Sequence, residues 1–196
     1  MTWQEIHNAD QLITLEINSW HTSVTDPIWV FFSDKYVWIP MYAAIIGLLI
    51  WRLGWKKGLV VLTAALLTFG FCDQFSNLIK NMVCRLRPLE DPFMLENGLH
   101  ILEWGGGYSF FSAHAANAFG LATSTFTGLR EDTRLKYRGY AAWMYFWAAM
   151  VAISRVFVGR HFLGDILTGS IIGGAAGLAF GMMARYVMQR MDKLSK

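Results

Sequence analysis

Long apolar stretches alternate with short polar segments along this chain. Five of the stretches are long enough to cross the hydrocarbon core of a membrane as helices, which takes about 20 residues for roughly 30 Å. They are Tyr36–Trp55, Gly58–Ile79, Phe110–Leu129, Gly139–Val158 and Ile166–Val187. The pattern therefore predicts an all-α, polytopic membrane helix bundle with about five transmembrane helices.

Two smaller patterns add detail to this prediction. In the first 25 residues, apolar positions such as Leu12 and Ile13 recur at helical spacing among polar ones, which predicts an amphipathic helix lying in the membrane interface. How far residues 10–32 enter the membrane stays open. In the last stretch, every fourth residue from Gly169 to Gly181 is glycine. Such a stripe permits close backbone packing against a neighbouring helix.

Length and composition agree with one membrane-embedded domain over residues 1–196. Hydrophobic residues make up 55% of the chain and charged residues only 16%, a balance typical of an integral membrane protein. The two cysteines, Cys72 and Cys84, have no metal-ligating company in the sequence and do not suggest a disulfide framework.

The basic residues fall in alternate connections, which sets the expected orientation. Eleven of the seventeen lie in the first short loop, the third loop and the C-terminal tail, which share one side if the helices alternate. They are Arg52, Lys56, Lys57, Arg130, Arg134, Lys136, Arg138, Arg185, Arg190, Lys193 and Lys196. The positive-inside rule makes that side, with the C-terminus, cytoplasmic, so residues 80–109 are external.

Three polar clusters lie at the external ends of the apolar stretches. Lys80–Pro88 leaves the second stretch, Phe111–His114 begins the third, and Ser154–Asp165 joins the fourth to the fifth. Since hydropathy alone puts all three at one membrane face, we expect their side chains to form a common site.

The residue types in these clusters suit phosphoryl transfer. Lys80, Arg87 and Arg155 supply cations that, with the N–H groups of a helix start, can bind a phosphate dianion. His161 and Asp165 are four residues apart, so on a helix the carboxylate can hold the imidazole by one ring N–H. His114 supplies a second imidazole, so that one histidine can attack phosphorus while the other protonates the leaving oxygen.

The motifs Lys-x6-Arg-Pro, Ser-x-His and Ser-Arg-x5-His-x3-Asp, in this order, resemble those of the type 2 phosphatidic acid phosphatase (PAP2) superfamily. The resemblance runs from Lys80 to Asp165. One departure is Phe111, because the family usually has proline at this place in the second motif. The resemblance implies a membrane lipid phosphatase that uses no metal and no cofactor and works through a phosphohistidine intermediate.

The resemblance also implies a role for each motif residue. His161 would be the nucleophile, Asp165 would accept its other ring N–H, and His114 would be the general acid that later activates water. The phosphate would be held by Lys80, Arg87, Ser112, Arg155 and the backbone of Ala113. Ser154 would support the site.

Other polar residues near the clusters receive smaller roles. Asp73 lies in the outer third of the second stretch, where polar groups usually face the bundle interior, and we expect it to orient a neighbour. Arg85 and Arg160 lie outside the motif positions and are interpreted as loop or headgroup contacts. The remaining histidines are interpreted as interfacial or solvated: His7, His21 and His100.

Two other classes of function stay open from the residues. A metal-dependent hydrolase could use His114, His161 and Asp165 as ligands, although the nearby cations would repel a divalent ion. A transporter or binder of an anionic lipid headgroup would explain the cations but not the spacing of the histidine and the carboxylate.

The expected substrate is a phosphorylated membrane lipid at the external face of a bacterial inner (plasma) membrane. The residues of the motifs are most similar to those of bacterial undecaprenyl-diphosphate phosphatases of this superfamily, so undecaprenyl diphosphate is the preferred substrate. Phosphatidylglycerophosphate, phosphatidate and lipid A are the alternatives. The expected partners are this lipid and the bilayer, and no nucleic acid.

Overall fold

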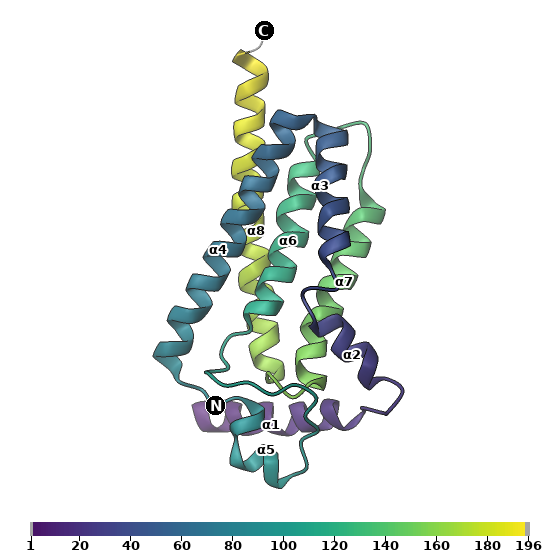
Figure 1. Cartoon of the computed structure of the whole chain (residues 1–196). Coiled ribbons are helices and arrows are strands. Elements are labelled where there is room, and N and C mark those ends of the chain that lie inside the picture. The colour runs from purple at the N-terminus through teal and green to yellow at the C-terminus, as the bar shows by residue number, and fades with distance from the viewer. Residues whose placement is uncertain (1, 195–196) are drawn as a thin grey trace.

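The structure of the chain is a computed structural model that describes residues 2–194. Met1, Ser195 and Lys196, the last of the basic tail residues, lie outside the described part. The elements are α1 (Trp3–Ser19), α2 (Asp26–Ser33), α3 (Ile39–Leu53), α4 (Trp55–Val83), η1 (Pro88–Glu90), α5 (Pro92–Glu96), α6 (Ala113–Leu129), α7 (Arg138–Phe157) and α8 (Leu163–Leu194). Figure 1 shows α3, α4, α6, α7 and α8 as an upright bundle, with α1 crossing beneath one end of it.

All five predicted membrane stretches are helical, so the expected fold class, a polytopic helix bundle, is confirmed. The helices α4, α7 and α8 are long and apolar enough to cross a membrane, and α3 is a shorter apolar helix. The 17-residue α6 is rich in Ala, Gly, Ser and Thr, and it packs against α4, α7 and α8. Its small side chains suit this central position, where other helices rather than lipid surround it.

The glycine stripe of α8 packs against α6, as its spacing predicted. A Cβ atom on Gly173 would lie 2.0 Å from the carbonyl oxygen of Ala116, and one on Gly169 would lie 2.5 Å from that of Ser112. Only glycine allows two backbones to approach this closely. The first turns of α6 and α8 therefore meet at the same end of the bundle, where the Ser112 N–H donates to the Asp165 carbonyl over 3.1 Å.

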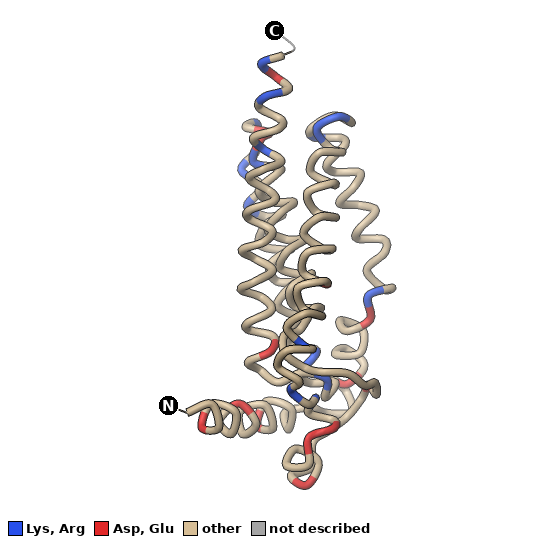
Figure 2. The backbone as a smooth tube through the Cα atoms, turned by 90° about the vertical axis from the view of Figure 1, so that its left-hand side faces the viewer, with Lys and Arg blue, Asp and Glu red and all other residues tan. Residues whose placement is uncertain are grey.

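Charged residues lie mainly toward the two ends of the bundle, and few lie along the length between them (Figure 2). At the end near the C-terminus, Arg52 pairs with Asp132 over 2.8 Å and Lys57 pairs with Asp192 over 2.7 Å. Large apolar side chains are exposed on the bundle helices, for example Leu66, Phe69, Phe146, Ile171 and Met182. An apolar belt between two charged ends is typical of a surface that faces lipid, and the chain is a membrane protein.

The helix α1 lies at the opposite end from the C-terminus (Figure 1) and buries polar rather than apolar residues. Gln11, Thr14 and Asn18 are 7%, 0% and 1% exposed, whereas Leu12 and Ile13 are exposed. The sequence correctly predicted an amphipathic helix here. It did not predict that the polar side would face the protein, where backbone and side-chain groups from distant segments satisfy its hydrogen bonds.

Candidate active site

His161 and Asp165 meet where α7 is joined to α8. His161 Nδ1 lies 3.4 Å from Asp165 Oδ2, and both side chains are buried. The N–H groups of Arg160 and His161 both donate to the carbonyl of Arg155, and Gly159 adopts a φ of +79°, which closes the connection tightly. Because Nδ1 faces the carboxylate, Nε2 is the ring nitrogen left for a reacting atom.

Burial lowers the pKa of His161 to about 3, and the Asp165 carboxylate offsets this effect only in part. His161 lies outside the membrane-spanning helices, in the connection between α7 and α8. Its imidazole is therefore neutral at physiological pH, with a lone pair on one ring nitrogen. A neutral imidazole can act as a nucleophile without first losing a proton.

The Asp165 carboxylate is held by three donors besides the histidine. Its Oδ1 accepts a 2.8 Å hydrogen bond from Arg85 Nη1, and its Oδ2 accepts one from the Phe162 N–H at 3.0 Å and one from the Ser109 hydroxyl. Ser109 Oγ also lies 3.3 Å from His161 Nδ1. The carboxylate is thereby fixed in orientation, and it fixes the orientation of the imidazole in turn.

Arg85 connects this carboxylate to α1. Its Nη2 lies 2.8 Å from Asp10 Oδ2 and 3.2 Å from His7 Nδ1. Its guanidinium also stacks on Phe162, 3.8 Å from the ring centroid, and only 7% of the side chain is exposed. The interpretation of Arg85 as a loop or headgroup contact is therefore wrong, because the guanidinium is buried between two carboxylates.

The same face of α1 caps the start of α8. Asp10 Oδ1 accepts a 2.8 Å hydrogen bond from the Gly164 N–H, and Thr14 Oγ1 accepts a 2.9 Å bond from the Leu163 N–H. One helical turn further, Asn18 Nδ2 donates to the carbonyl of Val156 over 3.0 Å. The bonds to Gly164 and Leu163 satisfy N–H groups that a helix start leaves without partners, and the bond from Asn18 reaches a carbonyl in the last turn of α7. All three bonds attach α1 to the two helix ends that flank the connection containing His161.

The second motif forms the start of α6. Ser112 is its N-cap, and the hydroxyl accepts a hydrogen bond from the Ala115 N–H over 3.4 Å. Ala113 is the first helical residue, so its N–H has no acceptor within the helix. Phe111, in place of the usual proline, is fully buried and packs on Phe75 with ring centroids 5.8 Å apart.

His114 lies in the first turn of α6. Arg155, Lys80 and Lys35 place positive charge near its imidazole, and the ring of His161 is close enough to interact with it. The structure thus brings His114 close to the motif residues of α4, α7 and the α7–α8 connection. Lys35, which comes from the turn after α2, is an addition that the motifs did not indicate.

The motif cations form one positive cluster that also includes Arg160. The charges of Lys80, Arg87, Arg155 and Arg160 act on one another. Arg87 Nε donates to the Gly107 carbonyl over 2.9 Å. Burial, with repulsion from Arg160 and Arg155, lowers the pKa of Arg87 to about 10, so it stays protonated at neutral pH. Such a cluster attracts a multiply charged anion.

Arg155 is also paired with a carboxylate, which the sequence did not predict. Its Nη1 lies 3.1 Å from Glu103 Oε2, and Ser33 bridges the two side chains by hydrogen bonds to both. The Nε atoms of Arg155 and Arg160 are buried and have no hydrogen-bond partner among the described residues. An oxyanion placed between them would supply the acceptor that both lack.

The two residues expected to support the site make different contacts. Ser154 Oγ donates to the Val151 carbonyl over 2.8 Å and so braces α7. Asp73 Oδ1 accepts a 3.1 Å hydrogen bond from Asn117 Nδ2 of α6, and its charge acts on Lys80. Neither contacts the two histidines in the described interactions.

The metal-dependent alternative needs the histidines and the carboxylate of the motifs to act as ligands of one ion. Within residues 2–194, the ligand atoms of His114, His161 and Asp165 do not converge to within 4.8 Å of one another.

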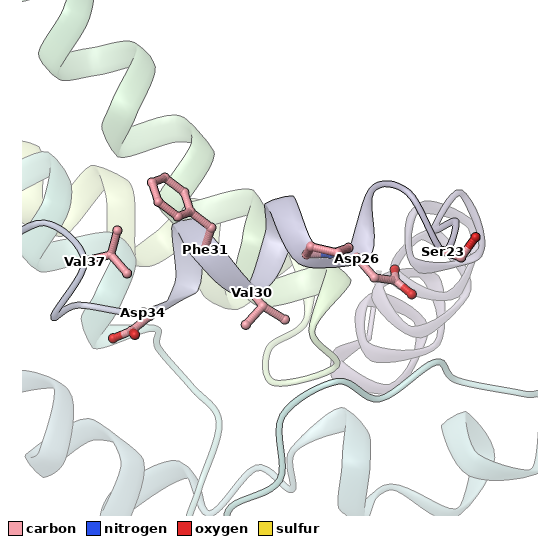
Figure 3. A pocket seen from close by; sticks show the side chains of 7 residues that line it. Ser23, Asp26, Val30, Phe31, Asp34 and Val37 are labelled. Atoms are coloured by element: carbon pink, nitrogen blue, oxygen red, sulfur yellow. The ribbon is translucent and has the colours of Figure 1, made fainter.

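A groove of about 610 Å³ runs along α2 (Figure 3). It is lined by Ser23, Asp26, Pro27, Val30, Phe31, Asp34 and Val37, so no motif residue lines it.

The sequence matches the PAP2 superfamily over residues 57–189, which is more than half of the chain and includes all three motifs. This chain belongs to the PAP2 superfamily. As a PAP2 protein it is a lipid phosphatase and a hydrolase, and the resemblance in its motifs is confirmed.

Two lipid A 4'-phosphatases are similar to this PAP2 chain. The one from Bacteroides thetaiotaomicron is 32% identical over 190 residues, which cover 95% of this chain and 82% of the relative. The one from Porphyromonas gingivalis is 28% identical over 170 residues, which cover 86% of this chain and 70% of the relative.

Two crystal structures are similar in fold to this chain. The phosphatidylglycerolphosphate phosphatase of Bacillus subtilis has a TM-score of 0.65 at 20% identity and covers 98% of this chain and 88% of its own. Aquifex aeolicus LpxE has a TM-score of 0.63 at 22% identity, and the match covers 86% of this chain and 92% of the LpxE chain. At these identities the likeness concerns the fold alone.

The sequence analysis did not identify several residues of the candidate site. Ser109, Asp10 and Glu103 lie outside the motifs, and they reach the site only because the 84–112 connection and α1 fold over it. Arg85 carried one signal, since it stands two residues before Arg87 in a short basic run. That spacing did not indicate which carboxylate it would meet.

Proposed function

We propose that this PAP2 phosphatase removes the 4'-phosphate of lipid A in the membrane, without a metal ion. The similarity of almost the whole chain to two lipid A 4'-phosphatases carries this proposal. It replaces undecaprenyl diphosphate as the preferred substrate, because the motifs that suggested that lipid are shared across the superfamily. The buried pair of His161 and Asp165 beside a cluster of cations supports the chemistry.

In the proposed mechanism His161 Nε2 attacks phosphorus while the bond from phosphorus to the ester oxygen breaks. His114 donates a proton to that oxygen, so the lipid leaves as an alcohol and a phosphohistidine remains. Water then attacks phosphorus, His114 accepts its proton, and phosphate departs from His161. The neutral state of His161 suits the first step, since its lone pair is free.

The phosphate is held, in this proposal, by the positive cluster and by the start of α6. Lys80 and Arg87 neutralise charge, the Ala113 N–H donates at the helix start, and Ser112 holds that turn in place. Arg155 Nε and Arg160 Nε, which are buried and have no hydrogen-bond partner within residues 2–194, donate to the same phosphate. These donors and cations stabilise the negative charge that the three equatorial oxygens of the phosphoryl group carry in the transition state.

Arg85 and Asp10 act in this proposal as positioning residues. Neither touches the phosphate; they hold Asp165 and the first turn of α8, and Asp165 holds His161. The whole arrangement lies at the end of the bundle opposite the basic loops and the C-terminus. By the positive-inside rule this end faces the outside of the inner membrane.

The lipid reaches the site, we propose, by moving sideways in the membrane. The site lies where the ends of α4, α6, α7 and α8 meet, so a lipid can present its phosphate while its chains stay in the bilayer. The exposed Trp104, with 74% of its surface accessible, lies on the long connection and suits the depth of lipid headgroups. Each buried methylene of a lipid chain adds about 0.8 kcal/mol to binding before ordering costs.

A panel of lipids tests the proposed substrate. Purified protein is given lipid A, undecaprenyl diphosphate, phosphatidylglycerophosphate and phosphatidate at equal mole fraction in detergent micelles, with the His161→Ala variant as the blank. We expect the highest kcat/KM with lipid A, and mass spectrometry should locate the lost phosphate at the 4' position. A higher kcat/KM with any other lipid of the panel would overturn the substrate, and release by His161→Ala would overturn the mechanism.

A further inference from the structure

Three potential metal ligands from separate segments meet beside the active-site end of the bundle. His21 follows α1, Asp26 begins α2, and His100 comes from the connection after α5. Their ligand atoms all lie within 4.8 Å of one another. His100 Nε2 is 3.0 Å from Asp26 Oδ2, and His21 Nδ1 is 3.6 Å from Asp26 Oδ1. The interpretation of His21 and His100 as interfacial or solvated did not include their contact with Asp26, and their side chains are 33% and 28% exposed.

Two of these atoms lack any hydrogen-bond partner. His21 Nδ1 and Asp26 Oδ1 are buried atoms without a partner in the described residues, although they face each other. Their separation of 3.6 Å is too long for a hydrogen bond. A buried nitrogen and a buried carboxylate oxygen that face each other without bonding call for a third atom between them.

The two imidazole rings lie against each other. They stack with centroids 3.5 Å apart and planes 6° from parallel. The stack brings the ring nitrogens of two separate segments to the same carboxylate.

We propose that His21, Asp26 and His100 bind one divalent transition-metal ion of the zinc class. Two imidazoles and a carboxylate suit such an ion, whereas calcium and magnesium prefer oxygen ligands. Bonds of roughly 2.0–2.2 Å in a tetrahedron put ligand atoms about 3.4 Å apart. The separations of 3.0 and 3.6 Å lie on either side of this value. One ring must rotate about its Cβ–Cγ bond to bring its lone pair onto the ion.

The surroundings give the ion a path and a structural role. Asp26 also lines the groove along α2 (Figure 3), which opens to the surface. The His100 N–H donates to Asn18 Oδ1 of α1 over 2.8 Å, and Asn18 Nδ2 donates to the His100 carbonyl over 3.0 Å. Three residues after His100 comes Glu103, the partner of Arg155. An ion here would tie the α1–α2 turn to the connection that carries Glu103.

Metal binding to the purified full-length protein tests the site directly. The protein is freed of metal with a chelator, then titrated with Zn²⁺ and with Co²⁺, whose visible absorption reports tetrahedral imidazole ligation. We expect one ion per chain and an increase in Tm on adding Zn²⁺. His21→Gln and Asp26→Asn should each weaken binding at least by the roughly 10- to 100-fold that loss of a supporting residue costs at metal sites.

Two matched variants keep the test decisive. Asp34→Asn removes a carboxylate at the other end of α2 and should leave the affinity for Zn²⁺ unchanged. His161→Gln should also leave it unchanged, which separates this site from an ion held at the motif histidines. The proposal fails if the wild type binds no Zn²⁺ at 100 micromolar, a concentration of the order of weak metal sites. It also fails if folded His21→Gln and Asp26→Asn bind as the wild type does. The readout is binding, so it stands whether or not lipid A is the substrate.

Discussion

Replacing Arg85 with methionine should slow turnover strongly while leaving the phosphate cluster in place. The substitution keeps much of the side-chain volume but removes the guanidinium that joins Asp165 to Asp10 over 2.8 Å on each side. A hydrogen bond to a charged group contributes about 1.5–3 kcal/mol. If the bond to Asp165 is needed to hold His161 for attack, its loss lowers kcat by roughly 10- to 150-fold.

The same substitution should destabilise the fold, so the assay must separate the two effects. Removing one partner of a buried ion pair costs about 3–5 kcal/mol of stability, and here Asp165 is fully buried. Thermal unfolding and size exclusion establish the folded fraction, and kcat is expressed per folded molecule. Arg85→Lys keeps the charge and should recover part of the rate, and Arg130→Met, which removes an exposed basic residue, should behave as the wild type.

The pH profile distinguishes positioning from mere stability. Burial holds the pKa of His161 near 3. Without Arg85 the negative charge of Asp165 is less compensated, which raises the pKa of the imidazole beside it. The attacking ring is neutral only above its pKa, so the acid limb of kcat should move to higher pH. A folded Arg85→Met enzyme with kcat within about threefold of wild type and an unshifted limb would refute this reasoning.

Other predictions follow from the motif residues and the topology. His161→Ala and His114→Ala should each abolish turnover, and vanadate should inhibit the wild type by occupying the cation cluster; an active His161→Ala enzyme would rule out the phosphohistidine. Turnover of the folded His21→Gln variant should be unchanged in excess EDTA, because cations already neutralise the phosphate; a loss that one divalent ion restores in this variant would indicate metal catalysis. A cysteine near Gly98, after replacement of Cys72 and Cys84, should react with an impermeant thiol reagent in intact cells, and labelling only after lysis would reverse the orientation. Long-chain lipids should exceed short soluble phosphate esters in kcat/KM; equal values would contradict sideways access through the membrane.

The helices and the motif cluster were accessible from the sequence for physical reasons. Apolar runs of membrane length must be helical, since a helix satisfies its own backbone hydrogen bonds in lipid. Alternating crossings then put Lys80, His114 and His161 at one end of the bundle. The glycine stripe through Gly173 predicted close packing of this helix against a neighbour, because four-residue spacing places small residues on one helix face.

The tertiary structure alone decided how the chemistry is held in place. Arg85 and Asp165 are 80 residues apart, and Asp10 and Gly164 are 154 apart. No periodicity records that such groups will meet. Their contact follows from packing: glycine lets α8 lie against α6, which sets where α8 begins, and α1 then docks its polar face on that start.

The same distinction explains the pairs and clusters that the sequence missed. Ser109 and Glu103 come from a connection without periodic pattern, so only its folded path brings them to His161 and Arg155. A polar residue on an interfacial helix normally faces water, which made α1 look peripheral in sequence. Hydropathy determined which segments enter the membrane and at which end polar groups gather. Which buried charge pairs with which partner depended on distances of a few ångströms between segments, and only the packed helices set those distances.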